Sequence, residues 1–166
     1  MGAAYKWMTQ EHASLCSEES YPYTDGNRQS DDTDDGTGVC QSASPGFCTP
    51  VAGIANYSYA AILNDTHLAA ALLQQPIAIG VEADVWQDYV SGVFTASCGA
   101  DIDHGVLLTG YGVDKSNATN PQPFWEIKNS WGSTWGEAGY IRIGRGPRYG
   151  PLGQCGILLQ PVYPTL

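Results

Sequence analysis

The sequence predicts an α+β protein in which short antiparallel strands outnumber the helices and form a small barrel or sandwich. Its 166 residues include 20 glycines and 10 prolines, a composition that favours many turns over long helices. About 43% of the residues are hydrophobic and 14% are charged, which is enough apolar material for one ordinary core. The sequence contains no internal repeat and no linker long enough to divide it.

The first predicted element is the tail of a helix, over residues 2–13. The residues expected on its packed face recur at helical spacing: Ala3, Ala4, Trp7 and Met8. No capping residue precedes this helix, so we expect the chain to begin inside a longer structure. Residues 16–23 are expected to be extended, because Pro22 disfavours helical geometry at Tyr21.

An aspartate-rich segment follows at residues 24–38, with four aspartates within five positions: Asp31, Asp32, Asp34 and Asp35. We interpret this segment as a solvated loop, because the spacing of a calcium-binding loop and its terminal glutamate are absent. Calcium ligation is the alternative interpretation.

Apolar runs separated by turn residues predict the strands. These runs cover residues 54–59, 77–83, 104–113, 124–128, 139–144 and 158–162. A helix over residues 67–75 is expected to be capped by Asp65 or Thr66 and to end before Pro76. Residues 85–89 are expected to form one or two helical turns, and residues 146–153 a loop.

The charge balance narrows the classes of partner. The formal net charge is −10 and the pI is about 4.4, so the surface repels nucleic acid and anionic membranes. We therefore expect neither nucleic acid nor membrane as a partner. An acidic protein also suits an acidic compartment. The sequence has no apolar stretch as long as a membrane-spanning helix, and no signal peptide opens it.

Five cysteines and three glycosylation sequons favour the secretory pathway. The sequons begin at Asn56, Asn64 and Asn117. The cysteines form no Cys-x-x-Cys pair, which argues against zinc, and we expect no metal and no cofactor. The odd number of cysteines leaves one thiol that is free, intermolecular or paired outside the chain.

His104 and Asn129 are the candidates for chemistry. His104 begins an apolar strand, and Asn129 ends another strand directly before Trp131 and Trp135. An imidazole that acts as a base needs its second nitrogen held by a hydrogen-bond acceptor, and an amide oxygen can serve without adding charge. An indole over this contact would exclude water and strengthen it.

Several motifs together closely resemble papain-like cysteine proteases, and the cathepsin L type in particular. They are Glu18-Glu19-Ser20-Tyr21-Pro22-Tyr23, Asp103-His104-Gly105-Val106-Leu107, Gly110-Tyr111-Gly112, Phe124-Trp125-Glu126-Ile127-Lys128-Asn129-Ser130-Trp131-Gly132, Trp135-Gly136, Gly139-Tyr140-Ile141, Cys155-Gly156-Ile157 and Tyr163-Pro164-Thr165. The resemblance extends from Met1 to the last residue. It implies the papain-like fold, with residues 1–23 as a remnant of the helical L domain and residues 24–166 as the β-barrel R domain.

The resemblance also implies roles for individual residues. His104 matches the catalytic histidine, Asn129 the asparagine that orients it, and Trp131 the tryptophan that shields both. Trp135 is expected to line the side of the leaving group, and Asp103 to lie at the cleft wall. The S2 pocket is expected to be shaped by four residues: Met1, Ala83, Ile102 and Gln160. With an amide at its base, this pocket is predicted to accept apolar P2 residues and to tolerate polar ones.

The nucleophilic cysteine of the family has no match here, because it opens a helix in a segment that would precede Met1. The resemblance pairs Cys98 with Cys155, and Cys40 with a cysteine upstream. Cys16 and Cys48 then remain as a further bridge, with Cys40–Cys48 as the alternative. An activated thiolate needs a helix N-terminus and a nearby cation, and none of the five cysteines is predicted to have them.

The resulting hypothesis is a secreted, lysosomal or vacuolar cysteine endopeptidase whose cysteine comes from a companion chain or an upstream segment. The 166 residues alone are predicted to be inactive. Expected partners are peptide or protein substrates and protease inhibitors. The alternatives are a non-catalytic papain-like module that binds peptides or an inhibitor, and a structural fragment without a function of its own.

Overall fold

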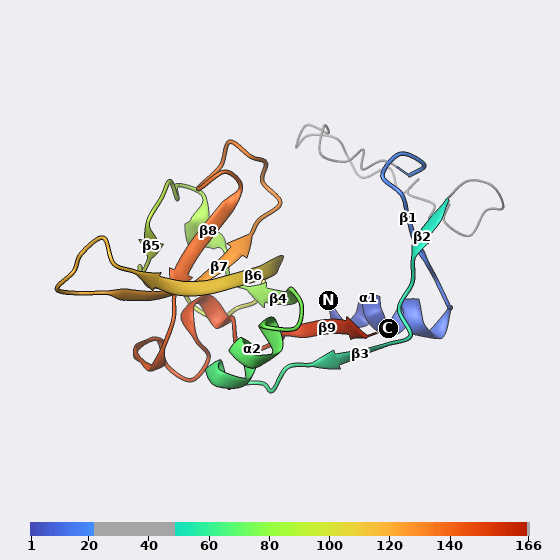
Figure 1. The fold of residues 1–166 in the computed structure, drawn as a ribbon, viewed down its shortest axis with the longest axis horizontal. Coiled ribbons are helices and arrows are strands. Elements are labelled where there is room, and N and C mark those ends of the chain that lie inside the picture. The colour runs from blue at the N-terminus through green and yellow to red at the C-terminus, as the bar shows by residue number, and fades with distance from the viewer. Residues whose placement is uncertain (22–48, 166) are drawn as a thin grey trace.

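The computed structural model describes residues 1–21 and 49–165 (Figure 1). The aspartate-rich segment, with its calcium alternative, lies outside these residues. So do Cys40 and Cys48, and so does the boundary expected between residues 23 and 24. These expectations stay predictions.

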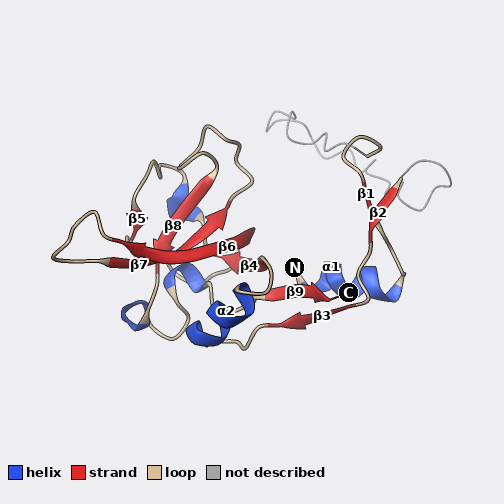
Figure 2. Ribbon diagram, viewed as in Figure 1, coloured by secondary structure: helices blue, strands red, loops and turns tan. Residues whose placement is uncertain are grey.

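The described residues form an α+β fold dominated by one sheet (Figure 2). Its order is β3-β9-β4-β6-β7-β8-β5, and every pair is antiparallel except β5–β8. The bounds are β3 Asn56–Tyr59, β4 Ile77–Val81, β5 Val93–Phe94, β6 His104–Asp114, β7 Gln122–Lys128, β8 Tyr140–Gly144 and β9 Val162–Thr165. A separate two-stranded sheet joins β1 (Leu15–Cys16) to β2 (Pro50–Ala52).

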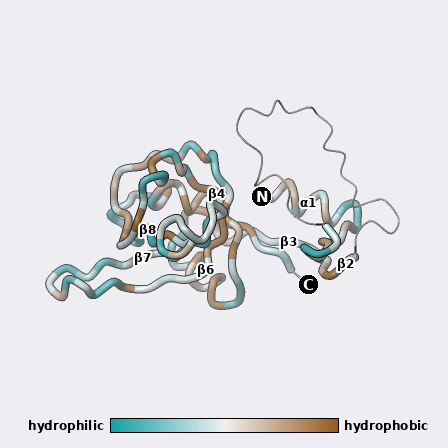
Figure 3. Tube along the Cα trace, turned by 90° about the horizontal axis from the view of Figure 1, so that it is seen from above, coloured by the Kyte–Doolittle hydropathy of each residue, from teal (hydrophilic) through white to brown (hydrophobic). Residues whose placement is uncertain are grey.

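The core lies on one face of β4, β6, β7 and β8. Strand alternation turns Ile127 toward its partner Ile141, and Trp125 toward Ile143. Ten large side chains are fully buried: Leu68, Ile77, Ile79, Trp86, Leu108, Trp125, Ile127, Ile141, Ile143 and Ile157. Burial of each stabilises the fold by about 1.5–3 kcal/mol. The core strands are brown in Figure 3, whereas the far part of the β6–β7 hairpin is mostly teal and white.

The first helix, α1 (Gly2–Gln10), packs on β3 with a face that differs from the predicted one. Ala3, Ala4 and Trp7 are exposed, and only Met8 of the expected set is buried. The contacts are made instead by Tyr5, which stacks on Tyr57 at 6.2 Å, and by Gly2. A Cβ at Gly2 would collide with the Tyr59 hydroxyl, so the prediction was wrong because aromatic packing and close backbone approach decided the face.

The second helix, α2 (Asp65–Leu72), begins one residue earlier than either predicted cap allows. Its cap is Asn64, whose Oδ1 accepts a hydrogen bond from the His67 amide at 2.9 Å, so the prediction of Asp65 or Thr66 was wrong. Asp65 instead lies in the first turn and pairs with Arg145 at 2.9 Å. This ion pair holds the helix N-terminus against β7, where Arg145 lies over Trp125 at 4.5 Å.

Two further predicted elements are shifted. The helical turn predicted at residues 85–89 is a short 3₁₀ helix one residue earlier, η2 (Asp84–Trp86), which buries Trp86. The last strand is β9 and not 158–162, because the segment before it turns through the 3₁₀ helix η4 (Gln154–Gly156) and packs Leu158 into the core. Among the described residues, no helix has the length and apolar character that crossing a membrane would require.

Candidate active site

His104 is placed by the pairing of β6 with β4. It is the first residue of β6 and lies opposite Val81, the last residue of β4. The preceding residue, Asp103, donates its amide to the Val81 carbonyl at 3.1 Å. The imidazole is half-buried at this edge of the sheet. The pairing of β6 with β4 therefore fixes the backbone position of His104, and neighbouring side chains decide how its ring is oriented.

Asn129 meets His104 from the end of β7. Its Oδ1 lies 2.8 Å from His104 Nε2 and also accepts the Ser130 amide at 2.8 Å. Its own amide donates to the Gly139 carbonyl at 2.9 Å. Because Oδ1 can only accept, the contact requires the proton of a neutral imidazole to be on Nε2. Nδ1 is then the nitrogen that is free to exchange a proton.

The other end of the Asn129 amide has no partner. Asn129 is 8% exposed, and its Nδ2 is buried without a hydrogen bond to any described residue. An unmet donor of this kind costs about 1–3 kcal/mol. The Ser130 amide, which can bond only to an acceptor, fixes the orientation that leaves Nδ2 unpaired.

One indole stacks on His104, and a second indole packs against the first. Trp131 stacks on the imidazole, with ring centres 5.1 Å apart and planes at 29°. Trp135 meets Trp131 edge-on at 5.0 Å and donates from Nε1 to the Gln87 carbonyl at 3.3 Å. The low-polarity rings strengthen the hydrogen bond beneath them by keeping water away.

The loop between β7 and β8 makes this stacking possible through glycines in the left-handed region. Gly132 has φ +90° and Gly136 has φ +55°. A Cβ on Gly136 would lie 2.6 Å from the Tyr140 carbonyl, whereas one on Gly132 would meet nothing within 4 Å. The turn at Gly136 therefore requires glycine for both backbone angle and space.

A hollow of about 260 Å³ lies beside the imidazole. Its lining consists of Ala83, Asp84, Gln87, Asp103, His104 and Trp131. Asp103 Oδ1 accepts the Ala83 amide at 2.9 Å, which holds this carboxylate at the wall. The negative charge and hydrogen bond of Asp103 raise the pKa of Asp84 above its ordinary value. Sequence reasoning placed Asp103 at this wall but did not single out Asp84.

Three of the four residues predicted to shape the S2 pocket lie beside one cross-strand pair, Gly80 and Gly105. A Cβ at Gly105 would be 3.2 Å from the Met1 sulfur, and a Cβ at Gly80 would lie 2.6 Å from Ile102 and 3.8 Å from Gln160. Paired residues of adjacent strands share one face, so these three side chains are neighbours, whereas Ala83 lines the hollow with Asp103; an S2 pocket formed by all four stays a prediction. The alternation of β4, which puts Gly80 opposite Gly105, was the signal that could have identified Gly80.

A second hollow, of about 310 Å³, borders Asn129 of the His104–Asn129 dyad, and His104 is not among its lining residues. Met1, Gly105, Asn129 and Ser130 are among its lining residues. A third hollow, of about 790 Å³, is lined by residues such as Asp114, Arg148 and Gln154, and His104 and Asn129 are not among them.

The covalent and glycosylation candidates lie apart from the dyad. Cys98 and Cys155 form a disulfide, and Cys16 is disulfide-bonded as well. Asn56 is exposed on β3 and Asn64 caps α2. Asn117 is exposed in the β6–β7 turn, with Oδ1 accepting from the Thr119 hydroxyl at 2.8 Å. In the described part of the chain, no three or more His, Cys, Asp or Glu residues gather into a potential metal site.

Known proteins resemble this chain both in sequence and in the arrangement of strands. The profile of the papain family cysteine proteases matches residues 1–165. The chain belongs to the papain family of cysteine proteases. The fold described above is therefore the papain-like α+β fold.

Two curated relatives from plants illustrate the relationship. The probable cysteine protease RD21C of Arabidopsis thaliana is 37% identical in an alignment of 169 positions, which covers 99% of this chain and 33% of the relative. The thiol protease SEN102 of Hemerocallis sp. is 38% identical over 152 residues, which is 90% of this chain and 38% of the relative. The chain thus spans little more than a third of the length of these relatives.

Solved structures of papain-family proteases superpose closely. The bromelain protease of Ananas comosus in complex with the E64 inhibitor has a TM-score of 0.80 and 34% identity, covering 98% of this chain and 67% of that chain. The proform of the ragweed pollen allergen Amb a 11 has a TM-score of 0.80 and 32% identity, covering 98% of this chain and 44% of that chain.

Proposed function

We propose that this chain supplies the histidine and asparagine of a cysteine endopeptidase, and that the nucleophilic cysteine comes from a segment outside the 166 residues. The observation that carries the proposal is the 2.8 Å contact between His104 Nε2 and Asn129 Oδ1 beneath Trp131. Membership of the papain family supplies the reaction class.

The geometry supports a division of work in which each ring nitrogen of His104 has one task. Nε2 holds the ring through Asn129, and Nδ1 exchanges protons with the nucleophile and the leaving group. Asn129 is neutral, so it orients the ring without favouring a permanent imidazolium as a carboxylate would. The Trp131 indole limits exchange of this hydrogen bond with water.

The reaction then proceeds in two balanced halves. A thiolate attacks the scissile carbonyl carbon, the C–N bond breaks, and protonated His104 gives its Nδ1 proton to the departing amine. Water next attacks the resulting thioester and loses a proton to Nδ1. The C–S bond breaks, which frees the product as a carboxylic acid that then ionises in water, and restores the thiolate–imidazolium pair.

The described cysteines support a nucleophile from elsewhere. Cys98, Cys155 and Cys16 are oxidised in disulfides and cannot form a thiolate. The motif Gln…Cys-Gly-Ser-Cys-Trp, which the family resemblance requires, does not occur in the 166 residues. On this proposal the chain alone does not hydrolyse peptides, and its companion is an upstream segment or a second chain.

The hollow beside His104 and the hollow beside Asn129 support a peptide or protein substrate that runs across the dyad. The leaving-group side falls between Asp103 and Trp131, and the acyl side falls near Met1, Gly80 and Gln160. The disulfide and the acidic surface support a secreted or vacuolar location.

Fusing the chain to a papain-family segment that carries Gln…Cys-Gly-Ser-Cys-Trp tests the proposal. The fusion should cleave a fluorogenic dipeptide with an apolar P2 residue, and a thiol-alkylating reagent should abolish the cleavage. His104→Ala in the same fusion is the matched control and should be inactive. A folded fusion that binds the peptide without cleaving it would contradict the proposal and favour the non-catalytic alternative.

A further inference from the structure

The loop that carries Asn129 and Trp131 is anchored at its far end by an arginine. Hydrogen bonds close the loop on itself, with the Gly139 amide bonded to the Trp135 carbonyl at 2.8 Å and the Asn129 amide to the Gly139 carbonyl at 2.9 Å. Glu137 lies within this closed loop, and Arg142 follows on β8. The position of the loop therefore depends on how Glu137 is held.

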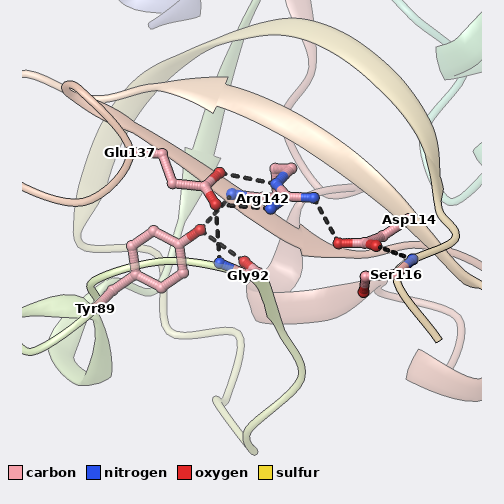
Figure 4. Close-up of polar contacts among 6 residues, drawn as sticks. All are labelled: Tyr89, Gly92, Asp114, Ser116, Glu137 and Arg142. Atoms are coloured by element: carbon pink, nitrogen blue, oxygen red, sulfur yellow. Dashed lines mark hydrogen bonds and ion pairs between the residues drawn. The ribbon is translucent and has the colours of Figure 1, made fainter.

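Arg142 holds Glu137 through both carboxylate oxygens (Figure 4). Its Nε donates to Oε2 at 2.8 Å and a terminal nitrogen donates to Oε1 at 2.7 Å. The other terminal nitrogen donates to Asp114 at 2.7 Å, at the end of β6. The planar guanidinium matches two carboxylates with fixed geometry, which a lysine ammonium cannot do.

The same group reaches the segment after η2. Glu137 Oε1 also accepts the Gly92 amide at 2.8 Å, and the Tyr89 hydroxyl donates to the Gly92 carbonyl at 2.6 Å. The Tyr89 ring packs on Trp135, with centres 5.6 Å apart. Trp135 meets Trp131, and Trp131 stacks on His104. A continuous series of contacts thus runs from Arg142 to the imidazole.

The charges in this group are mutually supporting. Hydrogen bonding to Arg142 lowers the pKa of Glu137, and the same contact raises the pKa of Arg142. The Arg142 and Glu137 side chains are 23% and 27% exposed, so water only partly screens them. The lowered pKa of Glu137 means that the ion pair persists to a lower pH than it would with a glutamate of ordinary pKa.

We propose that Arg142 is a positioning residue for the His104–Asn129 dyad, acting through Glu137, Tyr89 and the two tryptophans Trp135 and Trp131. The kinetic test of this inference rests on the proposed function, because it needs an active peptidase. The NMR test does not, because it needs only the folded protein. Arg142 touches neither substrate nor dyad. It fixes the loop that orients both Asn129 and Trp131, so its loss should alter the chemical step more than substrate binding.

The chain offers a matched control in Arg145 and Asp65. The side chains of this second arginine–carboxylate pair are 21% and 31% exposed. Arg145 directly follows β8, but its pair with Asp65 anchors α2 and not the loop. Arg142→Lys and Glu137→Gln are compared with Arg145→Lys and Asp65→Asn, all in the full-length protein that contains this chain. Tyr89→Phe, which keeps the ring and removes the hydroxyl, separates packing from hydrogen bonding.

In Arg142→Lys and Glu137→Gln, kcat/KM for a fluorogenic dipeptide should fall about 10-fold through a lower kcat, because small misplacements of catalytic groups greatly reduce the rate. The control variants should lose less than about twofold. Proton NMR of His104 provides the second readout: the Nε2–H resonance should shift or broaden in Arg142→Lys and stay in place in Arg145→Lys.

Equal loss of kcat/KM in the two pairs, or an unmoved Nε2–H resonance in Arg142→Lys, would overturn the positioning role. If the wild-type protein hydrolyses nothing, the proposed function is contradicted instead. The resonance comparison alone then decides whether Arg142 positions the imidazole.

Discussion

His104 Nε2 and Asn129 Oδ1 lie 2.8 Å apart, although 25 positions separate the two residues in the chain. β6 and β7 are adjacent strands, and their pairing brings the start of one beside the end of the other. The contact selects one tautomer of the imidazole and leaves Nδ1 for proton transfer.

Replacing Asn129 should impair chemistry more than stability. Asn129→Ala in the complete enzyme removes the acceptor from Nε2, so kcat should fall by at least about 10-fold. The truncation also removes the unpaired Nδ2, which offsets part of the stability lost with the two Oδ1 bonds. Steady-state kinetics and thermal unfolding measure the two effects. A large loss of stability with unchanged kcat would contradict the orienting role.

Gly136 and Gly132 should respond differently to the same change. Both have positive φ, but only Gly136→Ala also drives a Cβ to 2.6 Å from the Tyr140 carbonyl. Gly132→Ala should cost about 1 kcal/mol from backbone strain, and Gly136→Ala should cost more. Denaturant unfolding measures both. Equal costs would mean that the loop shifts easily and that its shape does not depend on Gly136.

Asp84 should make the protein less stable as pH rises. Asp103 raises the pKa of Asp84, so the stability contribution is intact below the pKa of the unfolded chain and is lost as pH rises through the folded pKa. Asp84→Asn should therefore raise Tm at pH 7 and change it little at pH 3. Asp88→Asn is the matched control, because it removes one exposed charge nearby. A stabilisation at pH 7 no larger than that of the control would contradict the repulsion.

Asp114 should have the opposite pH dependence. Hydrogen bonds from Ser116 and then from Arg142 lower the pKa of Asp114 to about 2. Its contribution to stability is present above the unfolded pKa of about 3.9 and is lost as pH falls through about 2. Asp114→Asn should lower Tm between pH 5 and 7 by more than it does near pH 2. A Tm difference that does not change with pH would contradict the lowered pKa.

Much of the fold follows from local patterns in the sequence. Apolar runs predicted strands at residues 124–128 and 139–144, and the structure has β7 and β8 there. The face of α1 could not be predicted, because it depends on Tyr57 and Tyr59 of a strand that is distant in sequence. The cap of α2 was misassigned because three consecutive residues can all act as caps, and only the backbone geometry selects Asn64.

In the candidate site, too, some residues could be recognised from the sequence and others could not. His104, Asn129 and Trp131 were recognisable because their residue types are unusual at strand ends and match a family motif. Asp84 and Gly80 were not, since a carboxylate after a strand and a glycine within one are common. Their significance comes from distant partners, Asp103 for one and Ile102 with Gln160 for the other. The role of Arg142 likewise depends on carboxylates from two other parts of the sheet.

On the proposed function, the nucleophile lies outside these 166 residues and His104 activates it. The most direct test treats the full-length protein with a thiol-reactive peptide and locates the adduct by peptide mapping and mass spectrometry. We predict a single adduct on a cysteine outside the 166 residues, formed much more slowly in His104→Ala. An adduct on any of Cys16, Cys40, Cys48, Cys98 or Cys155 that depends on His104 would contradict the claim.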